Sequence, residues 1–297
     1  MGNSKKYLNP AILSKIDNMA LRAKLVVEGY LVGKHKSPYH GFSVEFAEHR
    51  TYGQGDEIKH IDWKLYGKTD RYYVKRFEEE TNLRSYILLD TSKSMSYKIK
   101  NITKLKYGES LTAGLTHLMI NQKDAVGLIL FDDSIRKYIP PKTSKSHKNI
   151  IFNSLSKCRV GKNTNIRLIL DSMAERIKKS GLVILISDLL DDPRNVMKGL
   201  NHFRHNNQEV IVFHLIDKQE FNFTFNKRTR FTDMETGETI TTDPWHIQSS
   251  YQDKIKLFIN KYKKECGEQK IDYVPLFTDQ GFELALSEYI RKRHKSN

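Results

Sequence analysis

Four short apolar runs constrain the fold of this chain more than any other feature. They are Ser85–Asp90, Ala125–Phe131, Leu182–Ser187 and Val210–Ile216. Each run is too short for a helix and is apolar at successive positions, which is typical of strands buried on both faces of a parallel sheet. Helical patterns lie between the runs, for example over residues 103–120 and 165–179. This alternation predicts an α/β fold with a doubly wound, mostly parallel sheet.

The remaining segments extend this pattern. Residues 10–31 predict an N-terminal helix, because Asn9 and Pro10 suit a helix start and apolar residues recur at three- and four-residue steps. Ile135–Ile139 predicts an antiparallel strand, because few residues connect it to the strand before it. The other expected elements are a strand at Tyr72–Phe77, helices at Ser146–Lys157, His246–Cys266 and Phe282–Arg291, a β-hairpin within Phe221–Thr242, and a strand at Ile271–Phe277.

A change of composition divides the chain. Residues 41–80 mix glycine, aromatic and charged residues without a helical period, whereas the alternating pattern begins after them. We therefore expect residues 1–80 to hold the N-terminal helix and a small β appendage. Residues 81–297 are expected to form the sheet domain, with the hairpin inserted near 221–242.

Charge narrows the function classes only slightly. The formal net charge is +15, a balance compatible with nucleic acid, an anionic membrane or an acidic partner protein. The lysines are scattered, and only Arg291–Lys295 is a dense basic cluster, so nucleic-acid binding ranks last. No apolar run approaches the ~18 residues of a membrane span, and the N-terminus lacks the apolar stretch of a signal peptide. Cys158 and Cys266 form no paired motif, so we expect a cytoplasmic protein without a zinc ribbon.

Polar side chains follow two of the apolar runs. Asp90, Ser92 and Ser94 come at the end of the first run and Asp188 at the end of the third, while Thr164 precedes a helix between them. Ligands of such sheets bind beyond the carboxyl ends of the strands, so these side chains can converge. Carboxylate and hydroxyl oxygens select Mg²⁺, with Mn²⁺ or Ca²⁺ possible. We predict a metal site with an open position for a carboxylate of another molecule. The alternative is that Asp90 and Ser92 only cap the following helix.

A second group of residues lies in the β appendage. It consists of Arg50, Tyr52, Asp56, Asp62 and Trp63. An exposed Trp with Arg and Tyr neighbours is typical of a partner-binding surface. The alternative, which we slightly favour for the aromatic residues, is that they form the core of the appendage, because Trp is mostly buried in proteins.

The strand-end pattern resembles a von Willebrand factor A domain with a metal-ion-dependent adhesion site. Over about residues 41–293 the chain also resembles the family called domain of unknown function 58. The stretches that carry this resemblance are Gly41–Phe46, Arg50–Asp56, Ile61–Trp63, Asp124–Leu128, Ile186–Asp188 and Asp233–Glu238.

The resemblance implies a cytoplasmic bacterial adaptor that works with a MoxR-type AAA+ ATPase. Such an adaptor serves the maturation or assembly of a client protein complex. The metal-site residues carried over are Asp90, Ser92, Ser94, Thr164 and Asp188, and an acidic side chain of the partner would complete the coordination. We therefore expect a non-enzymatic protein.

The competing hypothesis is a Mg²⁺-dependent phosphoryl-transfer or phosphatase enzyme that uses the same acids. The sequence shows no nucleophile-and-base pair for it, and the chain has no P-loop of its own. His202 and His205 share a predicted helix face, but no Cys or carboxylate cluster accompanies them, so we expect a solvated face rather than a metal site.

Overall fold

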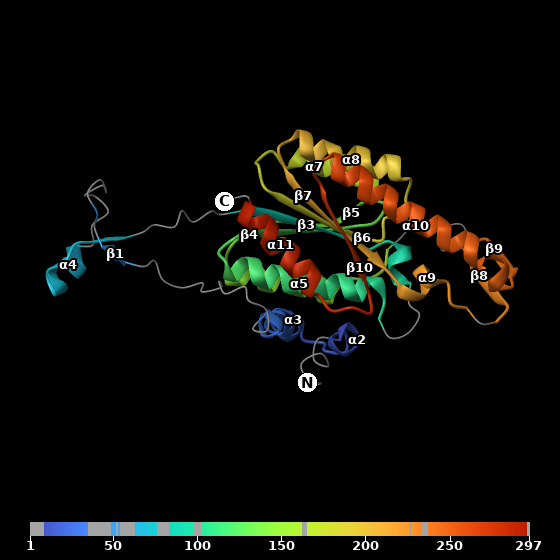
Figure 1. Cartoon of the computed structure of the whole chain (residues 1–297), viewed down its shortest axis with the longest axis horizontal. Coiled ribbons are helices and arrows are strands. Elements are labelled where there is room, and N and C mark those ends of the chain that lie inside the picture. The colour runs from blue at the N-terminus through green and yellow to red at the C-terminus, as the bar shows by residue number, and fades with distance from the viewer. Residues whose placement is uncertain are drawn as a thin grey trace. The chain divides into compact units, whose positions relative to one another are not determined.

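A six-stranded sheet lies at the centre of the computed structural model (Figure 1). Its strand order is β10-β7-β6-β3-β4-β5. The strands are β3 (Arg84–Asp90), β4 (Ala125–Phe131), β5 (Ile135–Lys142), β6 (Leu182–Ser187), β7 (Glu209–Ile216) and β10 (Asp272–Phe277). All neighbouring strands are parallel except β5, which pairs antiparallel with β4. The predicted fold class is confirmed: an α/β fold with a doubly wound, mostly parallel sheet and an antiparallel edge strand.

The structure describes residues 9–34, 49–51, 53, 63–75, 83–97, 102–161, 165–225, 227–232 and 237–295. The chain forms two compact units, residues 37–82 and the remainder. The smaller unit contains strands β1 (His49–Thr51) and β2 (Tyr73–Lys75), which pair antiparallel, and helix α4 (Trp63–Thr69). The N-terminal helices belong to the unit of the sheet, whereas the expected division at residue 80 groups them with the appendage.

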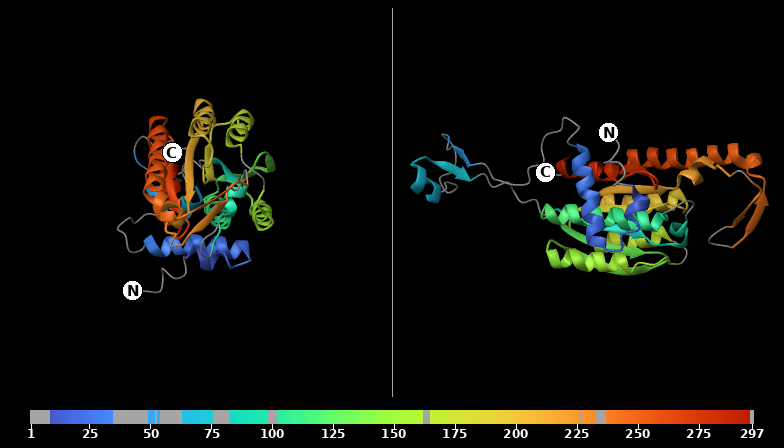
Figure 2. Two further views of the ribbon diagram at one scale, coloured as in Figure 1. Left: turned by 90° about the vertical axis from the view of Figure 1, so that its right-hand side faces the viewer. Right: turned by 90° about the horizontal axis from the view of Figure 1, so that it is seen from below.

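Helices cover both faces of the sheet (Figures 1 and 2). One face packs against α5 (Lys104–Asn121), α6 (Lys145–Ser156) and α11 (Glu283–Lys295). The other face packs against α7 (Ile166–Arg176), α8 (Pro193–His205) and α10 (Pro244–Glu268). In β3, Ile87 and Leu89 contribute to the first core while Tyr86 and Leu88 contribute to the second. The strand is apolar at successive positions because successive side chains enter different cores.

The prediction of a single N-terminal helix is wrong, because the segment forms two helices. They are α2 (Pro10–Leu13) and α3 (Met19–Lys34), with residues 14–18 between them. The predicted start is confirmed, since Asn9 Oδ1 accepts a hydrogen bond from the Ala11 N–H at 2.9 Å. A second start lies at Asn18, whose Oδ1 accepts from the Leu21 N–H at 3.1 Å. An internal side-chain cap of this kind competes with helix continuation.

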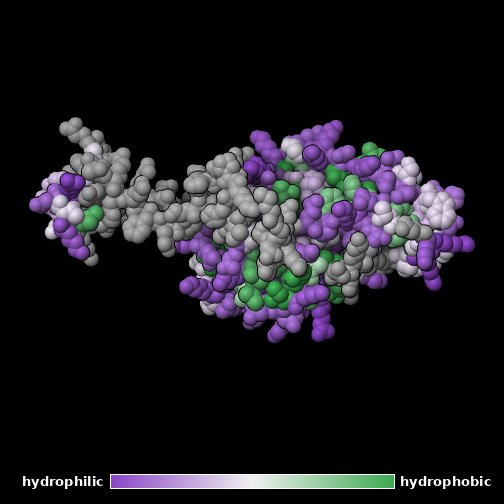
Figure 3. Space-filling view, turned by 60° about the horizontal axis from the view of Figure 1, so that its bottom comes forward, coloured by the Kyte–Doolittle hydropathy of each residue, from purple (hydrophilic) through white to green (hydrophobic). Residues whose placement is uncertain are grey.

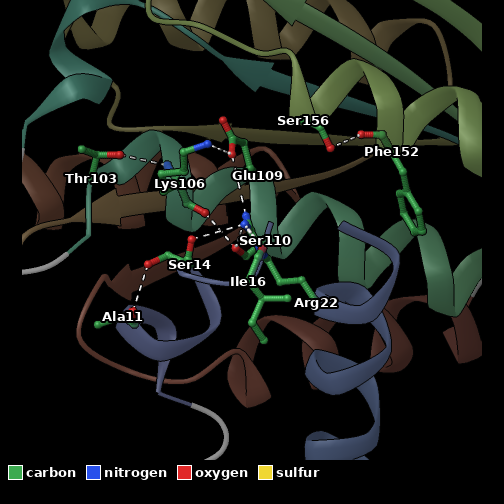
Figure 4. Close-up of polar contacts among 10 residues, drawn as sticks. All are labelled: Ala11, Ser14, Ile16, Arg22, Thr103, Lys106, Glu109, Ser110, Phe152 and Ser156. Carbon is green, nitrogen blue, oxygen red and sulfur yellow. Dashed lines mark hydrogen bonds and ion pairs between the residues drawn. The ribbon is translucent and has the colours of Figure 1, made fainter. Parts of the chain in front are cut away.

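Arg22 holds this break against the sheet domain (Figure 4). Its Nε donates to the Ile16 carbonyl at 3.1 Å, so the guanidinium satisfies a carbonyl that the interrupted helix leaves free. Its Nη1 lies 3.9 Å from Glu109 Oε2 on α5, and both side chains are almost completely buried. Lys106 Nζ binds the same Glu109 oxygen at 2.8 Å. Two cations therefore offset one buried carboxylate where α3 docks on α5.

The predicted hairpin is confirmed in part. Strands β8 (Thr229–Thr232) and β9 (Thr239–Thr242) pair antiparallel, while its first residues instead form the short helix α9 (Lys218–Asn222). Asp217 begins that helix, because its Oδ1 accepts from the Gln219 N–H at 2.8 Å. This helix matters for the site because its Glu220 pairs with Lys104, which in turn binds Asp188 at the carboxyl end of β6.

The basic C-terminal cluster is largely an internal ion-pair network. Arg291 Nη2 lies 3.0 Å from Asp272 Oδ1, and Lys292 contacts both Asp272 and Glu209. Arg293 Nε lies 2.8 Å from Asp124 Oδ2. These charges fasten α11 to the neighbouring strands, so they do not form a free basic tail.

The surface carries mostly hydrophilic residues. On the face drawn in Figure 3, purple hydrophilic residues predominate, and hydrophobic residues gather where α2 and α3 lie. Within the part of the chain that the structure describes, no helix combines the length and apolar character needed to cross a bilayer.

Candidate metal centre

The two predicted acids meet at one edge of the sheet because their strands are neighbours. Parallel pairing of β3 with β6 places Leu89 opposite Ile186, so Asp90 and Ser187 end adjacent strands at the same edge. The Ser187 hydroxyl donates to Asp90 Oδ2 at 2.7 Å, and the Ser92 N–H donates to Asp90 Oδ1 at 2.8 Å. Asp90 is therefore held at both oxygens by groups from two separate segments.

The two serines continue this cluster to Asp188. They lie on either side of the start of a short 3₁₀ helix, η2 (Lys93–Ser96), for which Ser92 occupies the N-cap position. Ser92 Oγ and Ser94 Oγ lie 3.0 Å apart, and the Ser94 hydroxyl donates to Asp188 Oδ1 at 3.2 Å. Ser92 makes no side-chain capping bond, which argues against a purely capping role.

The structure thus brings together four of the five predicted metal residues, namely Asp90, Ser92, Ser94 and Asp188. All four are buried. Thr164 lies outside the described residues, and its role stays a prediction. The cluster gathers hard oxygen donors: Asp90 accepts from the Ser92 N–H, and the hydroxyls of Ser92 and Ser94 lead on to Asp188.

Lys104 is a member of the site that the sequence analysis missed. Its Nζ lies 3.1 Å from Asp188 Oδ2 and 2.8 Å from Glu220 Oε2, and its side chain is only 2% exposed. It is the first residue of α5, directly after the N-cap Thr103. A lysine in the first turn of a helix interacts unfavourably with the helix dipole. This unfavourable position is the sequence signal from which a role for Lys104 could have been predicted.

Burial and like charge act together on Asp90. Burial, and then the neighbouring Asp188 carboxylate, raise the pKa of Asp90 to about 7, although hydrogen bonds from Ser92 and Ser187 oppose the rise. For Lys104, burial lowers the pKa, but the carboxylates of Asp188 and Glu220 outweigh it and the net change is upward. The site therefore holds one fixed cation among three acids.

A buried histidine, His214, lies near Asp188. Burial lowers the pKa of His214 to about 4, so its ring is neutral at physiological pH. His214 Nδ1 lies 2.6 Å from the Tyr273 hydroxyl, and Tyr262 donates to the Leu189 carbonyl at 3.3 Å. The Tyr262 hydrogen bond holds the loop after β6, in which Leu189 adopts a positive φ of 54°.

The residues present fit a hard divalent cation. A cation between two close carboxylates offsets their electrostatic repulsion, and serine hydroxyls add neutral oxygen ligands. Among the described residues there is no cluster of three or more His, Cys, Asp and Glu side chains arranged to hold a metal. A metal here would consequently depend on the hydroxyls of Ser92 and Ser94 as well as on the two acids.

Nearby polar residues have structural partners. Asp191 Oδ2 accepts from the Ile166 N–H at 3.2 Å, and Asp192 caps α8 by accepting from the Arg194 N–H at 2.9 Å. His202 Nδ1 lies 3.4 Å from Asp171 Oδ1 on a partly exposed helix face, as the sequence predicted.

The predicted partner-binding group of the appendage lies only partly within the described residues. Tyr52, Asp56 and Asp62 lie outside the described residues, and Arg50 is described only as a backbone position in β1. Trp63 begins α4, is 57% exposed and meets Tyr66 edge-on at a ring-centroid distance of 6.1 Å. The favoured interpretation of Trp63 as a core residue is therefore wrong, and partner binding by this group stays a prediction.

Comparison with known proteins gives a family but no activity. Uncharacterized protein Rv1480 of Mycobacterium tuberculosis is 21% identical over 217 residues, which is 71% of this chain and 67% of that protein. Among solved structures, the conserved hypothetical protein BatB of Bacteroides thetaiotaomicron aligns at 16% identity with a TM-score of 0.46, covering 72% of this chain and 99% of that one. An aerotolerance-related membrane protein from Bacteroides fragilis aligns at 16% identity with a TM-score of 0.48, covering 71% and 99%.

The family model described as "Protein of unknown function DUF58" matches residues 48–256. This match spans most of the chain and includes all five predicted metal residues. The chain therefore belongs to the DUF58 family.

Proposed function

We propose that this protein is a non-enzymatic adaptor that binds partner proteins through a divalent metal ion at the carboxyl ends of β3 and β6. The observation that carries the proposal is a polar chain between two strand ends. The Ser92 N–H donates to Asp90 Oδ1 at 2.8 Å, the Ser92 and Ser94 hydroxyl oxygens lie 3.0 Å apart, and the Ser94 hydroxyl donates to Asp188 Oδ1 at 3.2 Å. Mg²⁺ is the proposed ion, with Mn²⁺ and Ca²⁺ as alternatives.

Each residue has a distinct part in this proposal. Asp90 and Asp188 would hold the cation with charge, and the hydroxyls of Ser92 and Ser94, with Thr164, would hold it without adding charge. When bound, the ion supplies a Lewis-acid position that a carboxylate of the partner can fill. Ser187 keeps Asp90 in place, while Lys104 occupies Asp188 Oδ2 and leaves Oδ1 directed at Ser94.

The proposed partner is a MoxR-type AAA+ ATPase, with a client protein complex as the object of their joint action. This part rests on the resemblance of the motifs and on the family to which the chain belongs. A cytoplasmic location is proposed with it. We rank binding above catalysis because the Ser92 and Ser94 hydroxyls are engaged with each other and with Asp188.

The first test is metal binding followed by thermal unfolding. We expect Mg²⁺ to stabilise the wild-type protein by about 2.7 kcal/mol at a hundredfold excess over its dissociation constant. Asp90→Asn keeps the shape of the side chain and should lose this stabilisation. Asp253→Asn, at an exposed position on α10, is the matched control and should respond like the wild type. An equal Mg²⁺ response in Asp90→Asn would place the metal elsewhere.

The second test is capture of the purified MoxR-type ATPase of the same organism in Mg²⁺ and in EDTA. Capture by wild type in Mg²⁺ alone, lost in Asp90→Asn, supports a metal bridge. Capture that is indifferent to both EDTA and the substitution would contradict the metal bridge while leaving the ATPase as a partner.

A further inference from the structure

A pocket of about 470 Å³ opens beside the candidate metal centre. Thr91, which lies between Asp90 and Ser92, lines it together with Leu130 near the carboxyl end of β4. The volume falls within the range of sites that hold a ligand or a few side chains. The pocket and the metal centre are therefore neighbours on one edge of the sheet.

The described lining of this pocket is strongly basic. It includes Arg136 and Lys137 from β5, Lys157 at the end of α6, and Arg159 in the loop that follows. Arg136 Nε lies 3.6 Å from Asp132 Oδ2, which offsets one charge. Among the described residues, the other three cations make no ion pair. Three uncompensated positive charges around a concavity create a positive potential there.

Hydrogen bonds hold the segments that carry these basic residues against the sheet. Arg136 Nη1 donates to the Arg159 carbonyl at 2.9 Å, and the Gly161 N–H donates to the Thr91 carbonyl at 2.7 Å. A Cβ added at Gly161 would lie 2.0 Å from Asp132 Oδ2, so this loop presses against the Asp132–Arg136 pair. The loop that carries Arg159 is thereby tied to the strand end that carries Asp90.

Apolar groups complete the pocket. Leu130 is buried, while Ile150 is 52% exposed at the rim. Burial raises the pKa of the Cys158 thiol to about 12, so this cysteine is neutral and adds to the apolar lining. No aromatic side chain is among the described lining residues, so bases of a single-stranded nucleic acid would find no stacking platform there.

We propose that this pocket binds an acidic segment of a partner protein, with Glu or Asp side chains on Lys137, Lys157 and Arg159 and an aliphatic side chain beside Ile150. The inference rests on the proposed function only in placing both contacts on the same partner: one carboxylate at the metal and further carboxylates in the pocket. The pocket's own affinity for an acidic segment requires no metal.

The test is fluorescence polarisation with a fluorescein-labelled peptide of alternating Glu and Leu, and with its Gln counterpart. We expect the Glu peptide to bind wild-type protein in Mg²⁺ and in EDTA, and to weaken as salt rises. Lys157→Glu/Arg159→Glu should weaken binding about tenfold or more, which is ~1.4 kcal/mol. Lys178→Glu/Lys179→Glu makes the same charge change at exposed positions before β6 and should retain affinity within about twofold.

Each outcome decides the proposal. Equal loss in both double variants would mean that net charge alone attracts the peptide, and unchanged binding in the pocket variant would place the site elsewhere. Tighter binding of an oligothymidine of equal charge through the same pocket would replace the acidic segment with nucleic acid. Binding of the Glu peptide is measured without metal, so failure of the metal centre and failure of the pocket are distinguishable.

Discussion

Lys104 places a fixed positive charge where the sheet edge otherwise carries acids and hydroxyls. Its contacts with Asp188 and Glu220 join α5, the end of β6 and α9 at one buried point. A buried cation among acids holds their geometry, but it also repels a second cation at the same oxygens. Lys104 is therefore expected to stabilise the fold and to weaken metal binding.

Lys104→Met tests both effects. Removing the cation leaves Asp188 and Glu220 without their partner, so unfolding in urea with EDTA should show a loss of about 3 kcal/mol or more. The apparent affinity for Mg²⁺, measured by the rise in melting temperature, should increase because the competing charge is gone.

Two further variants complete this experiment. Lys179→Met changes an exposed lysine and should leave both quantities unchanged within about 0.5 kcal/mol. Lys104→Arg keeps the charge, so it should recover stability without a gain in Mg²⁺ affinity. A weaker Mg²⁺ response in Lys104→Met than in wild type would contradict the proposed competition.

At the scale of elements, α3 and α5 pack closely because Gly114 has no side chain. A Cβ added at Gly114 would lie 2.6 Å from Val26 Cγ1 and 3.3 Å from Val26 Cβ. Val26 is fully buried and β-branched, so it has little freedom to move aside. This glycine thus sets the distance at which the N-terminal helix docks.

Gly114→Ala is expected to destabilise the protein by about 1–2 kcal/mol, because overpacking outweighs the gain of ~1 kcal/mol in helix propensity. Gly267→Ala provides the matched control in α10, where a Cβ would meet nothing within 4 Å. That variant should be neutral or more stable by about 0.5 kcal/mol. Chemical denaturation measures the change in the free energy of unfolding for each variant. Equal changes in the two variants would show that helix propensity alone, without overpacking, determines the effect of Gly114→Ala.

Within the larger unit as a whole, ion pairs connect the end of the chain to the sheet. Lys292 contacts Glu209 at the start of β7 and Asp272 at the start of β10. Burial raises the pKa of both acids, but Lys292, together with Arg204 at Glu209 and Arg291 at Asp272, outweighs it, and the net pKa of each is lowered. Acids with lowered pKa contribute stability above their ordinary pKa of ~4 and lose it as pH falls through the folded-state value.

Lys292→Met should reduce the free energy of unfolding at pH 7 by about 1–2 kcal/mol, a modest figure because both acids are partly exposed. The wild type should lose stability more steeply than the variant below about pH 4, so the difference between them narrows there. Lys218→Met, in an exposed pair with Asp279, should change stability by at most ~0.5 kcal/mol at any pH. Parallel pH profiles of wild type and Lys292→Met would contradict this account.

The strands, and the sheet edge at which they end, follow from local residue patterns. The run Leu182–Ile186 is apolar at every position, and this local property already requires a strand covered on both faces. Helix starts were equally local, as Thr103 shows by accepting a hydrogen bond from the Lys106 N–H at 3.1 Å. Asp90 and Asp188 were predicted together because parallel strands place their carboxyl ends on one side.

Which charges meet depends instead on how distant segments pack against one another. Lys104 and Asp188 are 84 residues apart, and their pairing depends on how α5 begins beside the loop after β6. The break before α3 likewise depends on Arg22 reaching α5, and the basic C-terminal cluster became internal only when α11 met β10. Hydrophobic periodicity is a property of residues that are close in sequence and can be recognised locally. Ion pairs between distant segments depend on how the whole chain folds.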